Sequence, residues 1–184
     1  MISNHWLQRA EKISSPNYSD RPPPGRIDLL VIHCISLPPG QYGGGFIRDL
    51  FNNRLNANAH PYFKDIAELK VSAHLLIDRS GQIIQFVGFD KRAWHAGESC
   101  FMGEVDCNDF SIGIELEGAE DEPFEICQYR ALAQVSAELI QAYPLITRER
   151  IAGHSDIAGA RKTDPGPCFD WALYRRLLGQ YSKK

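Results

Sequence analysis

The chain has 184 residues, 23% of them charged, and a formal net charge of −3 at pH 7. This length is typical of one domain, and the slightly acidic balance argues against a nucleic-acid role, which usually leaves a basic footprint. No apolar run in the sequence approaches the ~18–20 residues of a membrane span, and the five cysteines include no C-x-x-C pair. We therefore expect a single domain over 1–184, with its core at about 27–178, and no disulfide framework or cysteine–zinc knot.

The predicted elements begin after a turn-rich leader. Ser14 to Arg26 contains Pro16 and the run Pro22-Pro23-Pro24-Gly25, and we expect it to be irregular. The apolar, branched run IDLLVIHC at 27–34 predicts a central strand that is buried on both faces. Residues 35–69 are interpreted as a long loop with a short helix near 46–51, and a loop of that length is more often functional than filler.

The second half of the chain predicts more strands and then helices. Strands are expected at 71–78 and 82–87, joined by the hairpin signal Arg79-Ser80-Gly81. The run FSIGIEL at 110–116 predicts a further strand. Apolar residues at helical spacing predict a helix over 125–143 that packs on the sheet, and a second helix is expected at 169–178 after a short strand. This order of elements indicates an α/β fold.

Three residues have the character of metal ligands. His33 ends the first buried strand, at the edge where open α/β sheets bind ligands, and His154 precedes Asp164 in the segment GHSDIAGARKTDPG. Taken separately, His33 is better explained as a hydrogen-bonded core histidine, and Asp164 as a turn-forming residue. Taken together, two imidazoles and one carboxylate supply the three protein ligands of a catalytic zinc, which keeps a fourth position for water.

Two further residues would complete a hydrolytic site. Glu115 lies near the end of the strand at 110–116 among small and apolar residues, which raise the pKa of a carboxyl toward the range useful for general acid–base chemistry. The alternative is a solvent-facing acid at the strand edge, which suits Glu117 better. Lys162 would share a side with Asp164 along an extended segment and could stabilise an oxyanion, although a solvated surface lysine is the ordinary alternative.

Six segments resemble a known enzyme family. They read LLVIHCISLPPGQYGG, NAHPYF, VSAHLLIDRSGQIIQFV, DKRAWHAG, CNDFSIGIELEG and GHSDIAGARKTDPGPCFDW, and they run from about residue 28 to 171. The chain is similar to the cytoplasmic AmpD-type 1,6-anhydro-N-acetylmuramyl-L-alanine amidases, within the larger fold group of peptidoglycan recognition proteins and phage-type amidases.

The resemblance implies a mixed central β-sheet flanked by helices, with one catalytic zinc ion (Zn²⁺). By motif, it places the ligands on His33, His154 and Asp164. It places the catalytic acid/base on Glu115 and the oxyanion-stabilising cation on Lys162. It also implies a small muropeptide substrate from cell-wall recycling, with an L-Ala-D-Glu-diaminopimelate stem. No membrane, nucleic acid or obligate protein partner is expected.

Four residues are candidate substrate contacts. Trp94 and His95, in AWHAG, could contact the bicyclic anhydro sugar, although Trp94 could equally be a core residue. Arg161 and Lys70 could bind the carboxylates of the stem peptide, because basic side chains are the natural partners of such groups. The chain departs from the common pattern of the family at Cys34, Gly159 and Lys70, where asparagine, proline and arginine are usual, and none of these positions is an expected zinc ligand.

Two other functions fit the same fold group. The first is a non-catalytic peptidoglycan-binding module, but such relatives typically lack a complete zinc set. The second is an exported amidase that acts on intact cell wall. The opening residues MISNHW show neither the basic nor the apolar region of a secretory signal, so we expect the cytoplasm instead.

Overall fold

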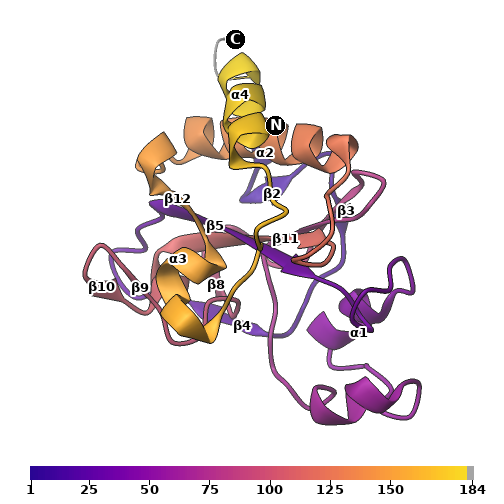
Figure 1. Cartoon of the computed structure of the whole chain (residues 1–184). Coiled ribbons are helices and arrows are strands. Elements are labelled where there is room, and N and C mark those ends of the chain that lie inside the picture. The colour runs from indigo at the N-terminus through magenta and orange to yellow at the C-terminus, as the bar shows by residue number, and fades with distance from the viewer. Residues whose placement is uncertain (182–184) are drawn as a thin grey trace.

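Two buried parallel strands form the centre of the fold. β5 (Leu29–Ile35) and β11 (Ser111–Glu117) lie side by side over their full lengths. All residues of β11 and the first five of β5 are buried, as expected of parallel strands that are covered on both faces. The computed structural model describes residues 1–181, and Figure 1 shows these two strands in the middle of the sheet.

The six-stranded sheet has the order β12-β5-β11-β6-β7-β3 and is mixed. β12 (Ile151–Gly153), β5, β11 and β6 (Leu75–Ile77) run parallel to one another. β7 (Ile83–Gln85) is antiparallel to β6, and the short β3 (Glu11–Lys12) is parallel to β7. The predicted α/β fold with a mixed central sheet is confirmed.

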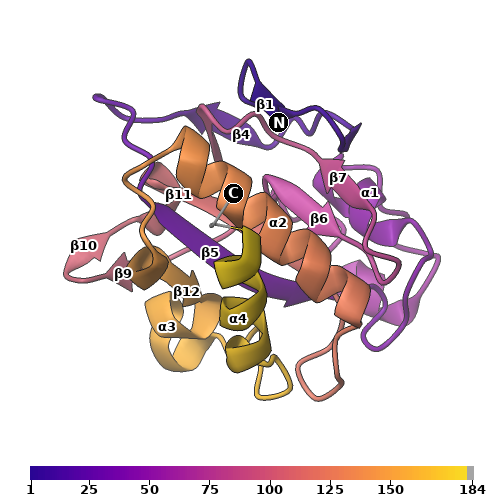
Figure 2. The same ribbon diagram turned by 90° about the horizontal axis from the view of Figure 1, so that it is seen from above.

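Helices cover both faces of this sheet (Figures 1 and 2). α2 (Ile126–Ala142) and α4 (Trp171–Tyr181) pack together on one face, over the even-numbered residues of β5 and β11. α1 (Phe46–Phe51) and α3 (His154–Ala158) contribute to separate apolar clusters on the other face. The odd-numbered residues of the two central strands therefore point away from α2, as strand alternation predicts.

The remaining elements are short. They are β1 (Ile2–Ser3), β2 (Trp6–Leu7), β4 (Tyr18–Asp20), β8 (Lys91–Ala93), β9 (Cys100–Phe101), β10 (Glu104–Val105) and the 3₁₀ turns η1 (Pro61–Asp65), η2 (Cys107–Asp109), η3 (Arg148–Arg150) and η4 (Gly159–Arg161). None of the helices among residues 1–181 is long and apolar enough to cross a membrane. The expected domain of 1–184 extends over 182–184, which lie outside the described residues.

The leader is more ordered than its prolines indicate. Within Ser14–Arg26, β4 pairs with β8 in an antiparallel ribbon. Arg21 is buried, and its guanidinium donates hydrogen bonds to the backbone carbonyls of Phe89, Asn108, Asp109 and Ser111. The expectation of an irregular leader was wrong in these places, because partners so far along the chain leave no local sequence signal.

Element boundaries also differ from those expected. The strands at 71–78 and 82–87 are regular only over 75–77 and 83–85. The last helix begins at Trp171 rather than at residue 169, because the Asp170 side chain accepts a hydrogen bond from the Leu173 amide in the manner of an N-cap. α3 was not expected, and it starts directly after β12.

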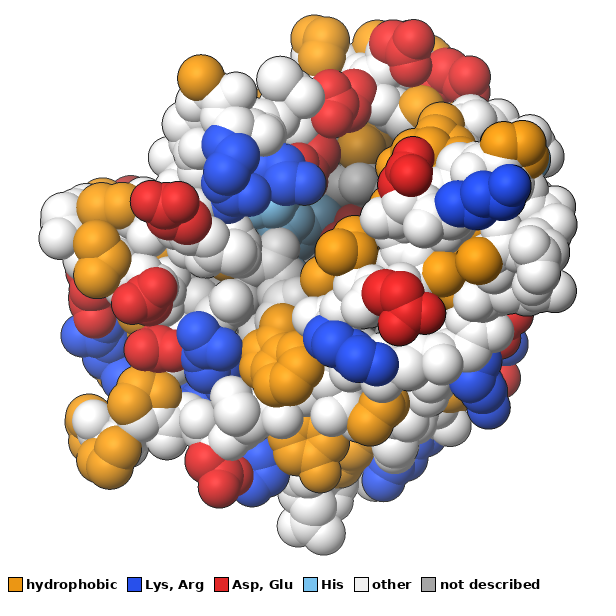
Figure 3. Space-filling model, turned by 90° about the horizontal axis from the view of Figure 1, so that it is seen from below, with side chains coloured by type: hydrophobic (Ala, Val, Ile, Leu, Met, Phe, Trp, Pro, Cys, Tyr) orange, Lys and Arg blue, Asp and Glu red, His pale blue; other side chains and the backbone are white. Residues whose placement is uncertain are grey.

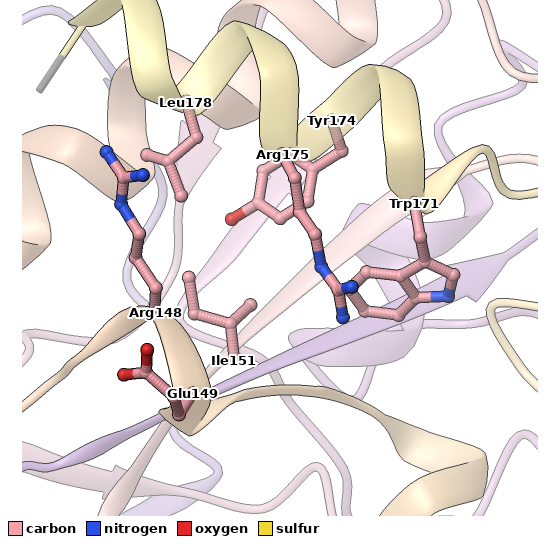
Figure 4. Close-up of a pocket in the computed structure, with 7 residues that line it drawn as sticks. All are labelled: Arg148, Glu149, Ile151, Trp171, Tyr174, Arg175 and Leu178. Atoms are coloured by element: carbon pink, nitrogen blue, oxygen red, sulfur yellow. The ribbon is translucent and has the colours of Figure 1, made fainter.

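A cavity of about 340 Å³ lies between α4 and the segment that leads into β12 (Figure 4). Its lining residues are Arg148, Glu149, Ile151, Trp171, Tyr174, Arg175 and Leu178. Tyr174 is buried and donates a hydrogen bond to Ser136 of α2, and the Arg175 guanidinium lies 5.7 Å from the centre of the Trp171 ring. This cavity shares no lining residue with the cleft at the ends of the central strands.

Candidate active site

A cleft of about 840 Å³ opens at the carboxyl ends of the central strands. Figure 3 shows the corresponding hollow on the face opposite α2 and α4, with histidine atoms on its floor and Lys or Arg and acidic side chains around it. The residues that line the cleft include His33, Trp94, His95, Glu115, His154, Lys162 and Asp164. Every residue expected to serve as a metal ligand or in catalysis therefore reaches one cavity.

The register of the sheet brings these side chains together. His33 of β5 is the direct partner of Glu115 on β11, and Gly153 of β12 is the partner of Ile32 on the other side of β5. His154 follows Gly153 and opens α3, so it lies next to His33. The two imidazole rings are 4.4 Å apart between centroids.

Asp164 completes a cluster with the two histidines. Its Oδ2 lies 3.2 Å from Nδ1 of His33 and 3.2 Å from Nδ1 of His154. One donor atom from each residue lies within 4.8 Å of the other two, and all three residues are buried. Ligands of a tetrahedral zinc at 2.0–2.1 Å are about 3.3 Å apart, so this set of two nitrogens and one carboxylate fits a metal ion.

A backbone hydrogen bond holds together the two ends of the segment from His154 to Asp164. The amide of Ser155 donates to the carbonyl of Asp164 at 2.9 Å, so the start of α3 is tied to the turn at 163–166. The second ring nitrogen of His154, Nε2, lies 3.1 Å from the carbonyl oxygen of Ala96. Both His154 and Asp164 are therefore fixed by contacts on the side away from the cluster.

Burial and hydrogen bonding set the protonation states of the cluster. Burial lowers the pKa of His33 to about 4, with His154 adding to the effect and Asp164 opposing it. Burial opposes ionisation of Asp164, but hydrogen bonds with His154 and His33 outweigh it and hold its pKa below the usual range. The result is a neutral His33 and an ionised Asp164 at neutral pH, the forms in which these groups bind a metal.

Glu115 has the opposite environment. Burial, followed by the nearby charge of Asp164, raises its pKa well above the usual range, and Lys162 opposes this shift. Its Oε2 is buried and has no hydrogen-bond partner within the described chain. A buried polar atom without a partner is uncommon in folded proteins and calls for an explanation such as a catalytic role or a bound water. Glu115 is thus available to exchange a proton with a bound molecule.

Glu117, the alternative acid on the same strand, is used differently. One of its oxygens accepts the Gly43 amide at 2.7 Å, and the other accepts the Arg79 amide at 3.2 Å. These contacts hold the glycine-rich loop and the turn after β6 against β11. Glu117 is not among the described residues that line the cleft, so the geometry favours Glu115 for chemistry.

The candidate substrate residues differ in their surroundings. Trp94 and His95 line the cleft, whereas Lys70 and Arg161 are not among its described lining residues. Lys70 is exposed, next to Val71 at the cleft. Nη2 of Arg161 donates to the carbonyls of Ala96 and Glu98 at 2.8 and 2.6 Å. Substrate contact by these four residues stays a prediction.

Comparison with known proteins identifies the family of the chain. Residues 23–167 match the model of the N-acetylmuramoyl-L-alanine amidase family, Amidase_2. The chain belongs to this family. A curated relative, the 1,6-anhydro-N-acetylmuramyl-L-alanine amidase AmpD of Citrobacter freundii, is 52% identical over 100% of this chain and 98% of its own length.

Solved structures support the same assignment. A crystal structure of a Se-Met AmpD derivative matches with a TM-score of 0.94 at 52% identity, over 97% of this chain and 99% of the other. AmiD of Escherichia coli, solved as a complex with the substrate anhydro-N-acetylmuramic acid-L-Ala-D-γ-Glu-L-Lys, matches with a TM-score of 0.61 at 30% identity. That match covers 92% of this chain and 61% of AmiD. The mixed sheet of this amidase is therefore the fold of its relatives.

Several residues around the amidase site were not singled out from the sequence. Ser111 and Gly113 lie on the same side of β11 as Glu115, and both contact the ring of His95. Asn108 accepts the backbone amides of His95 and Ala96 at 3.1 and 2.9 Å. The small residues at alternate positions of β11 were a usable signal, since they leave room for a ring above the strand.

Gly113 offers a direct test of this packing. A Cβ at Gly113 would lie 2.4 Å from Cγ of His95. We expect Gly113→Ala to lower the free energy of unfolding by about 1–3 kcal/mol, the usual range for overpacking a filled site. Gly179→Ala on α4 is the control, because its Cβ would meet nothing within 4 Å, and it should add about 0.5–1 kcal/mol through helix propensity. Denaturant unfolding measures both, and equal stabilities would contradict the packing described.

Proposed function

We propose that this protein hydrolyses the amide bond between the lactyl group of 1,6-anhydro-N-acetylmuramic acid and L-alanine, in a zinc-dependent reaction. The observation that carries the proposal is the convergence of three potential ligands and an unsatisfied buried carboxyl in one cleft. The likeness to AmpD of Citrobacter freundii, whose name states this bond and this sugar, supports the choice of substrate.

The metal in this proposal is held by His33, His154 and Asp164. Two imidazoles and one carboxylate are a donor set that zinc accepts in catalytic sites, and three protein ligands leave room for a further group. When bound, zinc supplies a Lewis acid that makes a water molecule nucleophilic at neutral pH. Glu115 lies in the same cleft and is paired with His33 across the two central strands.

In this proposal Glu115 transfers the proton, and Lys162 stabilises the negative charge that develops on the carbonyl oxygen. Glu115 accepts a proton from the attacking water and delivers it to the L-alanine nitrogen as the C–N bond breaks, which gives a muramic acid carboxyl group and a free peptide amine. The carboxyl group then passes its remaining proton to the amine or to solvent. Its raised pKa suits both steps, because the group must bind the proton and later release it. The Lys162 ammonium donates to the carbonyl oxygen while negative charge develops there.

The substrate is proposed to be a small muropeptide. Trp94 would pack against the anhydro sugar, and Lys70 and Arg161 would bind carboxylates of an L-Ala-D-Glu-diaminopimelate stem. Related amidases support this class, since AmiD of Escherichia coli was solved with an anhydromuropeptide. Cleavage rates of each basic-residue variant on a tripeptide substrate and on one that bears only L-alanine test the stem contacts, and equal losses would argue against them.

We place the reaction in cytoplasmic peptidoglycan recycling. All five cysteines lie among the described residues and are free thiols, which suits a reducing compartment. Fractionation of cells that express the protein tests this location. Recovery of the enzyme outside the cytoplasm would favour the alternative of an amidase that acts on intact wall.

The first prediction of the proposed function concerns the metal. The purified protein should contain about one zinc per chain, and His154→Ala should lose both zinc and hydrolysis, because a three-ligand site cannot hold the metal with two. His5→Ala is the control, since His5 is exposed and contacts Tyr143 instead of the cluster. Metal analysis and mass spectrometry of a digested anhydromuropeptide are the measurements. Full activity after exhaustive chelation would contradict the zinc proposal.

The second prediction concerns Glu115. Glu115→Gln keeps the side-chain volume but cannot accept a proton, so turnover should fall by roughly 10²–10⁴-fold with zinc content unchanged. Because the folded-state pKa of Glu115 is raised, its ionised form costs stability above the unfolded-state pKa. The variant should therefore be at least as stable as the parent at neutral pH.

Glu117→Gln is the matched control for this experiment. It alters a carboxylate that accepts two backbone amides, so it should lower stability while most of the turnover remains. Steady-state kinetics and denaturant unfolding on both variants separate the two roles. If Glu115→Gln turned over at the parent rate, the acid/base role would belong to another residue.

The third prediction concerns Trp94. If its half-buried ring stacks on the sugar, Trp94→Ala should raise KM and leave kcat largely unchanged, as expected for uniform binding energy. Trp171→Ala removes an indole from the distant cavity beside α4 and should leave KM unchanged. The unfolding midpoint is measured alongside, because a Trp94→Ala variant that unfolds at much lower denaturant with an unchanged KM would identify Trp94 as a core residue.

A further inference from the structure

The two histidines of the cluster are held from behind by different kinds of partner. Nε2 of His154 faces the backbone carbonyl of Ala96 at 3.1 Å. Nε2 of His33 faces Nδ1 of another imidazole, that of His95, at 2.9 Å. A carbonyl is always an acceptor, whereas a neutral imidazole nitrogen accepts only in one of its two tautomers. The His33 contact therefore depends on where His95 carries its proton.

With Nδ1 of His33 as a metal ligand, the contacts fit a single chain of hydrogen bonds. His33 presents Nδ1 to Asp164 and the open cleft, so its proton must lie on Nε2 when Nδ1 offers its lone pair to a metal. That N–H then donates to Nδ1 of His95. His95 consequently carries its own proton on Nε2, which lies 3.1 Å from Oγ of Ser111. A serine hydroxyl can accept this hydrogen bond.

The surroundings fix the His95 ring in this position. Asn108 accepts the backbone amides of His95 and Ala96. Gly113 leaves the space that the ring occupies, since a Cβ there would lie 2.4–2.7 Å from three ring atoms. The His33 and His95 rings meet edge to face with centroids 5.0 Å apart. Ser111 and Gly113 lie on β11, the strand that also carries Glu115.

We propose that His95 and Ser111 are positioning residues that set the tautomer and orientation of His33, and so raise the affinity of the cluster for zinc. The proposal deepens the zinc-dependent function proposed above and rests on it. Neither residue needs to touch the metal or the reacting amide for this role. Partners of this kind behind a metal-binding histidine typically contribute 10–100-fold in metal affinity or activity.

Three substitutions separate the hydrogen bonds from the packing. His95→Phe keeps a ring over Gly113 but removes the acceptor for His33. His95→Asn keeps an acceptor oxygen near the place of Nδ1. Ser111→Ala removes only the outer acceptor, and Ser111 is fully buried.

Ser136→Ala is the matched control for Ser111→Ala. Ser136 is also fully buried, and its hydroxyl accepts from Tyr174 and donates to the Leu132 carbonyl at the helix face of the sheet. Ser136→Ala therefore removes a comparable buried hydroxyl that does not contact the cluster. A general loss of stability would appear in both serine variants, whereas an effect on His33 would appear only in Ser111→Ala.

The zinc dissociation constant, measured by competition with a chromogenic chelator at fixed pH, is the principal readout. We expect His95→Phe to weaken zinc binding by about 10–100-fold, His95→Asn to recover most of that loss, and Ser111→Ala to weaken binding less than His95→Phe does. Ser136→Ala should bind zinc like the parent while unfolding at lower denaturant. Should His95→Phe fail to fold, the asparagine and serine variants still carry the comparison.

A second readout reports the tautomers directly. In NMR spectra of the zinc-loaded parent with ¹⁵N-labelled histidine, His33 and His95 should both be protonated on Nε2. A zinc-loaded parent with His95 protonated on Nδ1 would overturn the inference, as would parent-like zinc affinity in His95→Phe and Ser111→Ala or an equal affinity loss in Ser136→Ala. A parent chain that binds no zinc would overturn the proposed function as well, so the two failures are distinguishable.

Discussion

The parallel pairing of β5 with its two neighbours is the constraint on which the rest of the site depends. It sets His33 opposite Glu115 on one side and brings the end of β12, and hence His154, to the other. Side chains alternate along a strand, so a slip of one residue in either pairing would turn a site residue to the helix face. The apolar residues of β5 and β11 that pack under α2 therefore fix the site as well as the core.

The same cleft keeps two carboxyl groups in opposite states. Asp164 faces two imidazoles whose hydrogen bonds lower its pKa, while Glu115 is buried without a partner and its pKa is raised. Paired acids with environments that differ in this way commonly divide their roles, one as a fixed charge and the other as a proton carrier. The negative charge of Asp164 also helps to raise the pKa of Glu115, so the expected ligand and the expected base depend on each other.

Local patterns in the sequence predicted the parts of the fold that depend on local order. The apolar run at 27–34 and the helical period at 125–143 correspond to β5 and α2, within a few residues at each end. The convergence of His33, His154 and Asp164 followed from ligand chemistry and from the family motifs, and the structure brings the three side chains together.

Features that rest on pairing between distant segments could not be predicted in this way. Arg21 is buried because it caps carbonyls more than 60 residues away, and an arginine in a proline-rich leader gives no sign of that. His95 was predicted as a substrate contact from its aromatic neighbourhood alone. Its position behind His33 depends on two small residues of β11, and only the packed structure shows which ring occupies the space above them.

Cys34 illustrates how burial protects the cluster from a competing ligand. It directly follows His33, and a thiolate there would be a strong competing ligand for zinc. Its side chain, however, packs partly against the apolar cluster under α2, and burial raises the pKa of its thiol above the usual range, with Glu115 adding to the effect. Because only the thiolate binds metals well, Cys34 stays a neutral neighbour at neutral pH. Cys34 also lines the cleft, so the protonation state of a residue selects the ligand set in addition to its identity.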